Sequence, residues 1–462
     1  ADSSSAAAEP AAYSTGSTRI LKSVFDDSKI HNISMKCLYT GTYCTVWGST
    51  SDNSSIRINA SQAAQIGQQF DSTIQQERNA FGSYWCDTDG DGKVAIMCYD
   101  IDGEYGQSVG TYTAGYFFSR DLINHSGYIN SHYFGSNYYL NGLDCIHIDT
   151  YPGMGTNLNN ISRCYSTLTH EFQHMINFSY CVKGSSYLSS METYLNEAFS
   201  MASEHMILGA SSTSSRISYF NSSSYIKGSP LTYWNGTLSN YSNSYLFGQY
   251  IRTRYAQTGR DGNTIYKTVL ERRSNSNSDT LGIIADLLST SKKQLILDFW
   301  TAVAVRKSSG KYGFNGESWA NSIEIPYSSL SSSTSGIYNG GVKFYSLAGK
   351  TFTPASSSNI AFVAMDDNGP TEGGPQAKDA QIRRLSSAQA EFSFTPTASG
   401  FLRYLITDGE SSITHDMLSQ GTRVSILGSQ QNAIQLYPEG PDDNDSLYLS
   451  FDLVSNTGAV ST

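Results

Sequence analysis

The sequence feature that most constrains this chain is the pentapeptide His170-Glu-Phe-Gln-His174, which lies in a segment with helical periodicity. On a helix, His170 and His174 are one turn apart on the same face, so both imidazoles reach one metal ion. Glu171 projects beside them, where a water on that metal would sit. Apolar residues on a second face would bury the same helix: Leu168, Phe172, Met175 and Ile176.

The alternative for this helix is a core element with two satisfied histidines. The chain has only 8 histidines among 462 residues, so a chance match to H-E-x-x-H is improbable. The metal hypothesis also requires a third protein ligand, which the sequence offers further along the chain.

A second helix supplies candidates for that third ligand. It is expected to begin near Ser189, with Ser189 and Glu192 forming a capping box, and to end at Gly209. With Glu192 assigned to the cap, Glu197 is the expected third zinc ligand. Glu204 lies two turns further along nearly the same face and is a candidate to orient a ligand histidine, with a solvated helix residue as the alternative.

Two histidines and one glutamate would leave the fourth position of Zn2+ to water. Zinc lowers the pKa of such a water, and Glu171 is the expected general base that takes its proton during attack on a peptide carbonyl. The oxyanion then needs a further donor. Tyr241 and Tyr245 are candidates near the start of a later helix, although composition gives neither any weight because the chain has 32 tyrosines.

Two segments carry a resemblance to known families. They are His170-Glu-Phe-Gln-His174-Met-Ile-Asn and Glu192-Thr-Tyr-Leu-Asn196-Glu197-Ala-Phe-Ser. They resemble the hyicolysin-type zinc metallopeptidases of the gluzincin group, and looser blocks extend the similarity over roughly residues 35 to 310: Phe70-Asp71, Phe81-Gly82, Asp87–Gly92 and Gly115–Phe117. The resemblance implies an α+β gluzincin-like core, one catalytic Zn2+ and hydrolysis of peptide bonds.

The segment Asn196–Glu204 is also similar to the zinc-glutamate helix of aminopeptidase N-type enzymes. In those enzymes a Tyr-x-x-Gly stretch before a helix supplies the tyrosine that stabilises the oxyanion. Tyr241-Ser-Asn-Ser matches that stretch with Ser in place of Gly. Tyr241 is therefore the first candidate for this role and Tyr245 the second.

The expected activity is that of a zinc endopeptidase. An aminopeptidase is the first alternative, but no anchor for a substrate amino terminus is evident. The metzincin pattern fails because Asn177 and Tyr180 replace its Gly and third His. The second alternative is a surface binding or adhesion protein with an inactive or structural metal helix, in which His147 or His205 would replace the water.

A calcium site is a further candidate. Asp87-Thr-Asp89-Gly-Asp91-Gly resembles the first half of an EF-hand loop, with Asp87, Asp89 and Asp91 as ligands of Ca2+. Cys98 occupies the position of the bidentate glutamate, so a substitute is sought among Asp100, Asp102 and Glu104. A plain Asp/Gly turn is the alternative.

Length and periodicity predict three regions: a flexible leader at 1–18, a metallopeptidase region at 19–325, and a C-terminal β-sandwich at 326–462. The metallopeptidase region should be β-rich to about residue 155 and helical afterwards. The sandwich would serve packing, substrate binding or cell-surface attachment. Elements expected in the catalytic region are strands at 36–47, 55–59, 94–101, 114–118 and 145–151, helices at 60–81, 244–255, 280–289 and 292–305, and a loop at 211–243.

Composition limits the partners and the location. A net charge of −10 and a pI near 5.3 argue against nucleic acid and anionic membranes, and no apolar run is long enough to span a bilayer. The seven cysteines fit either disulfides or buried free thiols. A protein or peptide substrate is expected. We expect an exported bacterial protein, extracellular or on the cell surface, with a lipid anchor upstream as a hypothesis.

Overall fold

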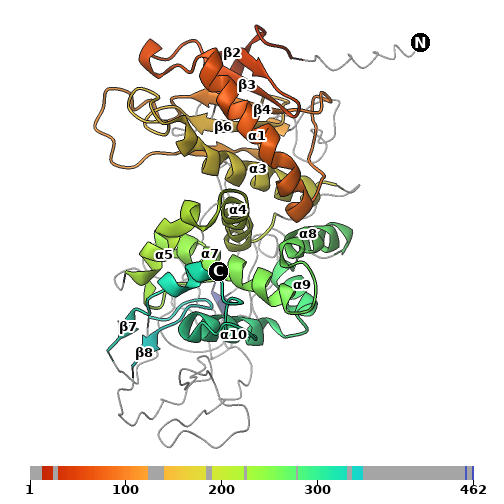
Figure 1. The fold of residues 1–462 in the computed structure, drawn as a ribbon, viewed down its shortest axis with the longest axis vertical. Helices are drawn as coiled ribbons and strands as arrows, with labels where there is room; N and C mark the ends of the chain where they lie inside the picture. The colour runs from red at the N-terminus through yellow and green to blue at the C-terminus, as the bar shows by residue number, and fades with distance from the viewer. Residues whose placement is uncertain are drawn as a thin grey trace, which may run out of the picture.

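The computed structural model describes residues 13–23, 30–122, 140–183, 190–222, 226–276, 279–329 and 336–346, with two short strands at Leu453–Val454 and Val460–Ser461. Figure 1 shows a sheet at one end of the molecule, helices α7 to α10 at the other, and α3 and α4 between them. Helices and strands are thus largely segregated along the chain. This mixed architecture agrees with the expected α+β class.

The main sheet has six strands in the order β1-β2-β3-β4-β6-β5. β1 to β3 are antiparallel neighbours, β3, β4 and β6 are parallel, and β5 runs antiparallel to β6 at the edge. β4 and β6 are buried along their whole length, which explains their continuous apolar runs. The bounds are β1 Thr18–Ser23, β2 His31–Thr40, β3 Cys44–Ser49, β4 Val94–Tyr99, β5 Gly115–Phe117 and β6 Cys145–Asp149.

Helix α1 (Ala60–Phe81) packs on β2 and β3 and confirms the predicted helix at 60–81. It begins with a reciprocal capping box, in which Asn59 Oδ1 accepts from Gln62 N at 3.0 Å and Gln62 Oε1 accepts from Asn59 N at 2.9 Å. It ends at Gly82, whose φ of 115° favours glycine. Both ends are therefore set by local chemistry.

The helical part follows the sheet along the chain. α4 packs on both α3 and α7, and α3 also contacts β5 and β6, so α3 joins the sheet to the helices. One continuous apolar core runs through both parts. The helices are α3 Cys164–Cys181, α4 Thr193–Leu208, α5 Ser214–Asn221, α7 Leu238–Ala256, α8 Ile265–Ser276, α9 Thr280–Leu287 and α10 Lys292–Val305.

Shorter elements complete the described chain. The 3-10 turns are η1 Ser54–Ile56, η2 Ser119–Leu122, η4 Ile161–Arg163, η5 Ala210–Thr213, η6 Gly262–Thr264 and η7 Ser318–Ser322. The remaining strands form two pairs, β7 Tyr327–Ser328 with β8 Phe344–Tyr345 and β9 Leu453–Val454 with β10 Val460–Ser461. The other strands expected for the C-terminal sandwich lie outside the described residues, as do residues 1–12 of the expected leader.

Two predicted elements were wrong in type or start. The strand expected at 55–59 is instead the turn η1, because Asn53 Oδ1 accepts from Ser55 N at 3.0 Å and closes the chain locally. α4 begins at Thr193, and Glu192 at its N-cap makes no side-chain capping bond. The capping-box assignment of Glu192 therefore fails, and Ser189 lies outside the described residues.

The predicted loop at 211–243 was wrong in part, since it contains α5 and the first turns of α7. The sequence pattern placed the start of α7 at Ser244, six residues too late. The buried residues of its first turns are polar and show no apolar period: Ser239, Asn240, Ser242 and Asn243. Asn240 Nδ2 donates to the carbonyls of Pro230 and Tyr233 at 3.1 and 3.0 Å. The Asn240 side chain thus provides a donor for two backbone carbonyls of the preceding segment.

All seven cysteines lie in described segments, and all are buried free thiols. Of the two alternatives left open by the sequence, the structure therefore has free thiols. Burial raises the pKa of the Cys86 thiol to about 12, which makes it unreactive as a nucleophile.

Candidate metal centre

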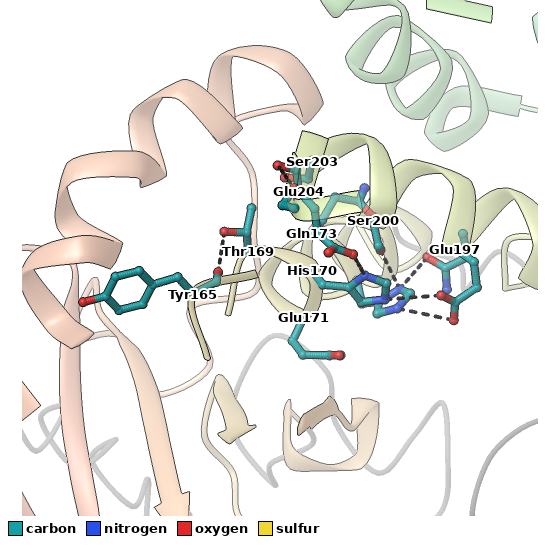
Figure 2. A network of polar contacts seen from close by, with 12 residues as sticks. Tyr165, Thr169, His170, Glu171, Gln173, Glu197, Ser200, Ser203 and Glu204 are labelled. Atoms are coloured by element: carbon teal, nitrogen blue, oxygen red, sulfur yellow. Dashed lines mark hydrogen bonds and ion pairs between the residues drawn. The ribbon is translucent and has the colours of Figure 1, made fainter. Parts of the chain in front are cut away.

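The structure brings the three predicted zinc ligands together. His170 and His174 lie one turn apart on α3, with ring centroids 4.7 Å apart, and Glu197 faces both from α4. Glu197 Oε2 lies 3.2 Å from His170 Nε2, and Glu197 Oε1 lies 3.6 Å from His174 Nε2 (Figure 2). One donor atom from each residue lies within 4.8 Å of the others, so a single ion can contact all three.

The opposite nitrogens of the two rings are held by other residues. His170 Nδ1 lies 2.7 Å from Glu204 Oε1, as predicted for Glu204. His174 Nδ1 lies 3.0 Å from Asn196 Oδ1 and 3.1 Å from Ser200 Oγ. With Nδ1 donating in each ring, Nε2 is left with its lone pair directed at the site, which is the tautomer that a metal requires.

Sequence reasoning missed the polar network behind His174. Gln173 and Asn177 exchange amide hydrogen bonds of 2.6 and 3.0 Å on α3. Ser200 Oγ donates to Gln173 Oε1 at 2.7 Å, and Asn177 Nδ2 donates to Asn196 Oδ1. Gln173, Asn177 and Ser200 are buried, so this network fixes α3 against α4. The available signal was that Asn196 and Ser200 flank Glu197 on its own helix.

The predicted general base stands beside the ligands. Glu171 is 7% exposed, and its Oε2 accepts a hydrogen bond of 2.8 Å from Phe117 N on β5. Figure 2 shows its carboxylate apart from the contacts between Glu197 and the rings. Burial raises the pKa of Glu171, and the neighbouring His170 and His174 only partly offset this effect. A raised pKa suits a carboxylate that must accept and release a proton near neutral pH.

The electrostatics of the centre favour a cation. Burial opposes charge on His170, but Glu197 and Glu204 outweigh it and raise the pKa of this ring well above its ordinary value. Burial likewise opposes charge on Glu197, but His174 and His170 lower its pKa. Glu197 Oε2 is buried and has no hydrogen-bond partner among the described residues; it lies 3.2 Å from His170 Nε2. Two imidazole nitrogens and one carboxylate form a donor set that Zn2+ accepts in catalytic sites.

The two tyrosine candidates differ in their surroundings. Tyr241 is half-buried on α7, and the charge of Glu197 and then burial raise the pKa of its phenol. The guanidinium of Arg216 lies 4.8 Å from its ring centroid. Tyr245 is fully buried, and its hydroxyl lies 2.9 Å from His205 Nδ1. Tyr241 thus lies in the electrostatic field of the metal ligands, whereas the Tyr245 hydroxyl is engaged in the core.

The remaining candidates for metal ligands have other partners. His147 lies 2.9 Å from Asp121 Oδ2 through Nε2 and 3.0 Å from the Tyr99 hydroxyl through Nδ1. His205 is held by Tyr245, as described above. His147 belongs instead to a separate buried group with Asp121 and Cys145, in which one donor atom from each residue lies within 4.8 Å of the others. Neither His147 nor His205 joins the group of His170, His174 and Glu197.

The expected calcium ligands come together only in part. Asp87 and Asp89 lie with Asp144, one oxygen from each within 4.8 Å of the others. The Asp91 carboxylate instead accepts from Lys93 N at 2.8 Å. The additional carboxylate of this group is Asp144, and not Asp100, Asp102 or Glu104 as expected. Asp144 directly precedes β6, the strand that pairs with β4.

No family model matches the chain. It is 36% identical over 299 residues to the protein named "Neutral metalloprotease ShpI" of Staphylococcus hyicus. The similarity supports a zinc metallopeptidase family. The match covers 62% of this chain and 62% of that relative, so the chain spans less than two thirds of the relative's length.

Proposed function

We propose that the chain is a zinc-dependent endopeptidase that hydrolyses peptide bonds within protein substrates, of the hyicolysin type that its motifs resemble. The observation that carries this proposal is the convergence of His170, His174 and Glu197 on one point, with Glu171 beside them. The neutral metalloprotease named above supports it, since its printed name describes metal-dependent proteolysis.

In this mechanism, His170, His174 and Glu197 would hold the ion. Bound Zn2+ supplies a Lewis acid that polarises a carbonyl and acidifies water. Glu171 takes the proton of the attacking water and passes it to the leaving amine. Tyr241 is proposed to donate a hydrogen bond to the developing oxyanion, with Tyr245 as a weaker candidate because His205 holds its hydroxyl.

The sheet edge offers a place for an extended substrate. β5 pairs with β6 only, among the described strands, and its Phe117 amide contacts Glu171. A peptide that adds to this edge would run past the catalytic groups in an extended form. β5, and not its neighbour β6, is the edge strand of this sheet. An open edge suits cleavage within a chain and is the reason to prefer an endopeptidase to an aminopeptidase.

The binding-protein alternative requires a closed metal shell or a missing base. His147 and His205 are engaged elsewhere, which supports a fourth position open to water. Glu171 is buried and forms no ion pair with the described residues, and a structural metal site has no need of a general base.

An exported protein, extracellular or at the bacterial cell surface, remains our proposal for location, with protein or peptide as the substrate. Lipid anchoring and surface attachment through the C-terminal region are parts of that proposal. Within the described residues, no helix combines the length and apolar character needed to cross a bilayer.

The decisive experiment compares native protein, Glu171→Gln and the exposed control Glu324→Gln. We expect Glu171→Gln to keep its zinc and lose about 100-fold or more of casein hydrolysis, since general-base catalysis contributes roughly that much. The control should match native protein. Full activity in Glu171→Gln would refute the mechanism, and zinc without cleavage in native protein would favour a binding protein.

A substrate with blocked amino termini separates the two peptidase classes. An endopeptidase should cleave succinylated casein into internal fragments at the rate seen with unmodified casein. Cleavage that requires a free amino terminus and releases single residues would instead identify an aminopeptidase.

A further inference from the structure

A cluster of three carboxylates lies outside the proposed metal centre, where the loop between α1 and β4 meets the start of β6. Asp87 and Asp89 belong to the loop at 86–93, and Asp144 immediately precedes β6. Parallel pairing aligns Ala95 of β4 with Cys145 of β6, and Ala95 N donates to Asp144 O at 2.9 Å. This register brings Asp144 beside the loop, so one oxygen from each aspartate lies within 4.8 Å of the others.

Each of these aspartates has an oxygen without a partner. Asp144 is fully buried; its Oδ2 accepts from Trp85 Nε1 at 3.1 Å, but Oδ1 has no hydrogen-bond partner among the described residues. The Oδ1 atoms of Asp87 and Asp89 are also buried and unpaired in this part of the chain. Burial of a carboxylate oxygen without a donor is costly, and one such oxygen on each of the three grouped aspartates indicates a missing positive partner.

The nearby cationic side chains do not fill that role. Lys93 Nζ donates to the carbonyls of Gly41 and Thr42 at 2.6 and 2.7 Å. Arg19 donates to Asn141 O at 3.2 Å, and its Nε and Nη1 make no hydrogen bond within the described residues. Neither side chain forms an ion pair with the three aspartates there.

Burial and, to a smaller extent, mutual repulsion disfavour charge on these carboxylates. Burial, followed by the charge of Asp91, raises the pKa of Asp89 to about 7. Burial and the charges of Asp89 and Asp87 raise the pKa of Asp144 well above its ordinary value. Either a proton or a cation must relieve this repulsion at neutral pH. The loop is already shaped around Asp87, whose Oδ2 accepts from Gly92 N at 3.1 Å.

We propose that Asp87, Asp89 and Asp144 bind a divalent cation that prefers oxygen ligands, with Ca2+ as the probe. The donor set contains only carboxylate oxygens, and the partial exposure of Asp87 and Asp89 leaves room for waters to complete the shell of a hard cation. Asp91 is left out of the proposed ligand set because it does not belong to this group, and its Oδ1 accepts from Lys93 N. The ion would tie the loop after α1 to the start of β6, and this proposal does not depend on peptidase activity.

Calcium titration of the full chain, loaded with one equivalent of zinc in calcium-depleted buffer without a chelator, tests the site. Isothermal titration calorimetry should show saturable binding, and the unfolding temperature should rise with Ca2+. Asp144→Asn and Asp89→Asn should each weaken the affinity at least about tenfold, since each removes one of three charged ligands. The exposed control Asp286→Asn should bind like native protein.

Two outcomes would overturn the proposal. Absence of saturable binding, with an unfolding temperature indifferent to Ca2+, would mean that a proton relieves the repulsion instead. A strong loss of affinity in Asp91→Asn, with none in Asp144→Asn, would show that the ligands are the three aspartates of the loop, Asp87, Asp89 and Asp91. If Asp144→Asn fails to fold, the affinity of Asp89→Asn for Ca2+ provides the same test at a partly exposed position.

Discussion

Each histidine of the proposed metal centre has a hydrogen-bond partner on the side of its ring away from the site. Glu204 holds His170, and Asn196 together with Ser200 holds His174. The partners differ in charge, so the two rings do not have the same electrostatic support: a carboxylate makes the His170 ring more electron-rich than an amide makes the His174 ring. All these partners lie on α4, so the third ligand and the orientation of the other two depend on one helix.

Replacing the partner of His170 tests this arrangement. Glu204→Gln should keep the hydrogen bond but remove its charge, and we expect zinc affinity to fall about 10- to 100-fold. Competition with a chromogenic zinc chelator measures the affinity. Glu324→Gln, which removes an exposed carboxylate, should leave it unchanged, and an unchanged affinity in Glu204→Gln would contradict an orienting role.

His205 provides a test at the residue scale that is independent of zinc. Burial and the charge of Arg252 lower its pKa from 6.5 to about 4. The unfolded chain therefore binds an extra proton between these values, so the stability that His205 contributes is complete above pH 6.5 and is lost as the pH falls to about 4. That contribution is at most about 3 kcal/mol.

Urea unfolding at pH 7 and pH 4.5 measures this effect. His205→Gln cannot titrate, so its stability should change less between the two pH values than that of native protein. Equal pH dependence in the two proteins would show that another group is responsible.

At the scale of elements, α1 shows how local chemistry sets a boundary. Its capping box satisfies backbone donors that would otherwise lack partners at the first turn. Its buried face includes Ile66, Phe70 and Ile74, and Phe70 packs edge-on against Phe172 of α3 with ring centroids 5.1 Å apart. α1 thereby packs against α3, the helix that carries His170 and His174, from the side of the sheet.

Removal of the cap should destabilise the whole fold. Asn59→Ala should lower the free energy of unfolding by about 1 kcal/mol, the usual contribution of an N-cap. Chemical denaturation measures the change. Ser61→Ala, an exposed substitution in the same turn, is the matched control and should have little effect; equal stability of both variants would mean that the cap contributes nothing measurable.

At the scale of the molecule, the metal ligands bridge α3 and α4, and these helices join the sheet to the remaining helices. An ion held by both helices binds the folded chain alone, so it should stabilise the entire fold. The stabilisation is about 2.7 kcal/mol when free zinc is 100 times its dissociation constant.

Chelation tests this coupling. A zinc-selective chelator such as phenanthroline should lower the unfolding temperature of native protein, and added Zn2+ should restore it. His174→Ala, which lacks a ligand, should show neither change. Added Ca2+ should not restore the unfolding temperature after phenanthroline treatment, which separates this effect from that of the proposed calcium site. An unfolding temperature insensitive to phenanthroline would argue against a bound ion between the helices.

Local patterns in the sequence determined the elements that carry the chemistry. The spacing of His170 and His174 required a helix, and the cap at Asn59 with Gly82 set both ends of α1. The histidine spacing and each helix end depend on residues within one or two turns of each other, so they can be predicted from the sequence. Glu197 was predicted after Glu192 had been assigned to a cap, an assignment that fails, whereas Glu204 was a candidate from its spacing to Glu197. The structure brings both to His170.

Tertiary structure decided which distant residues meet. Asn196 and Ser200 reach His174 only because α4 crosses α3 at this place, and Phe117 N reaches Glu171 only because β5 pairs with β6 as the edge strand beside α3. Asp144 joins Asp87 through the parallel register of β4 and β6, which no local pattern encodes. Helix crossing and strand register result from packing of the whole core, and for that reason a single sequence reveals the ligands more readily than the residues that position them.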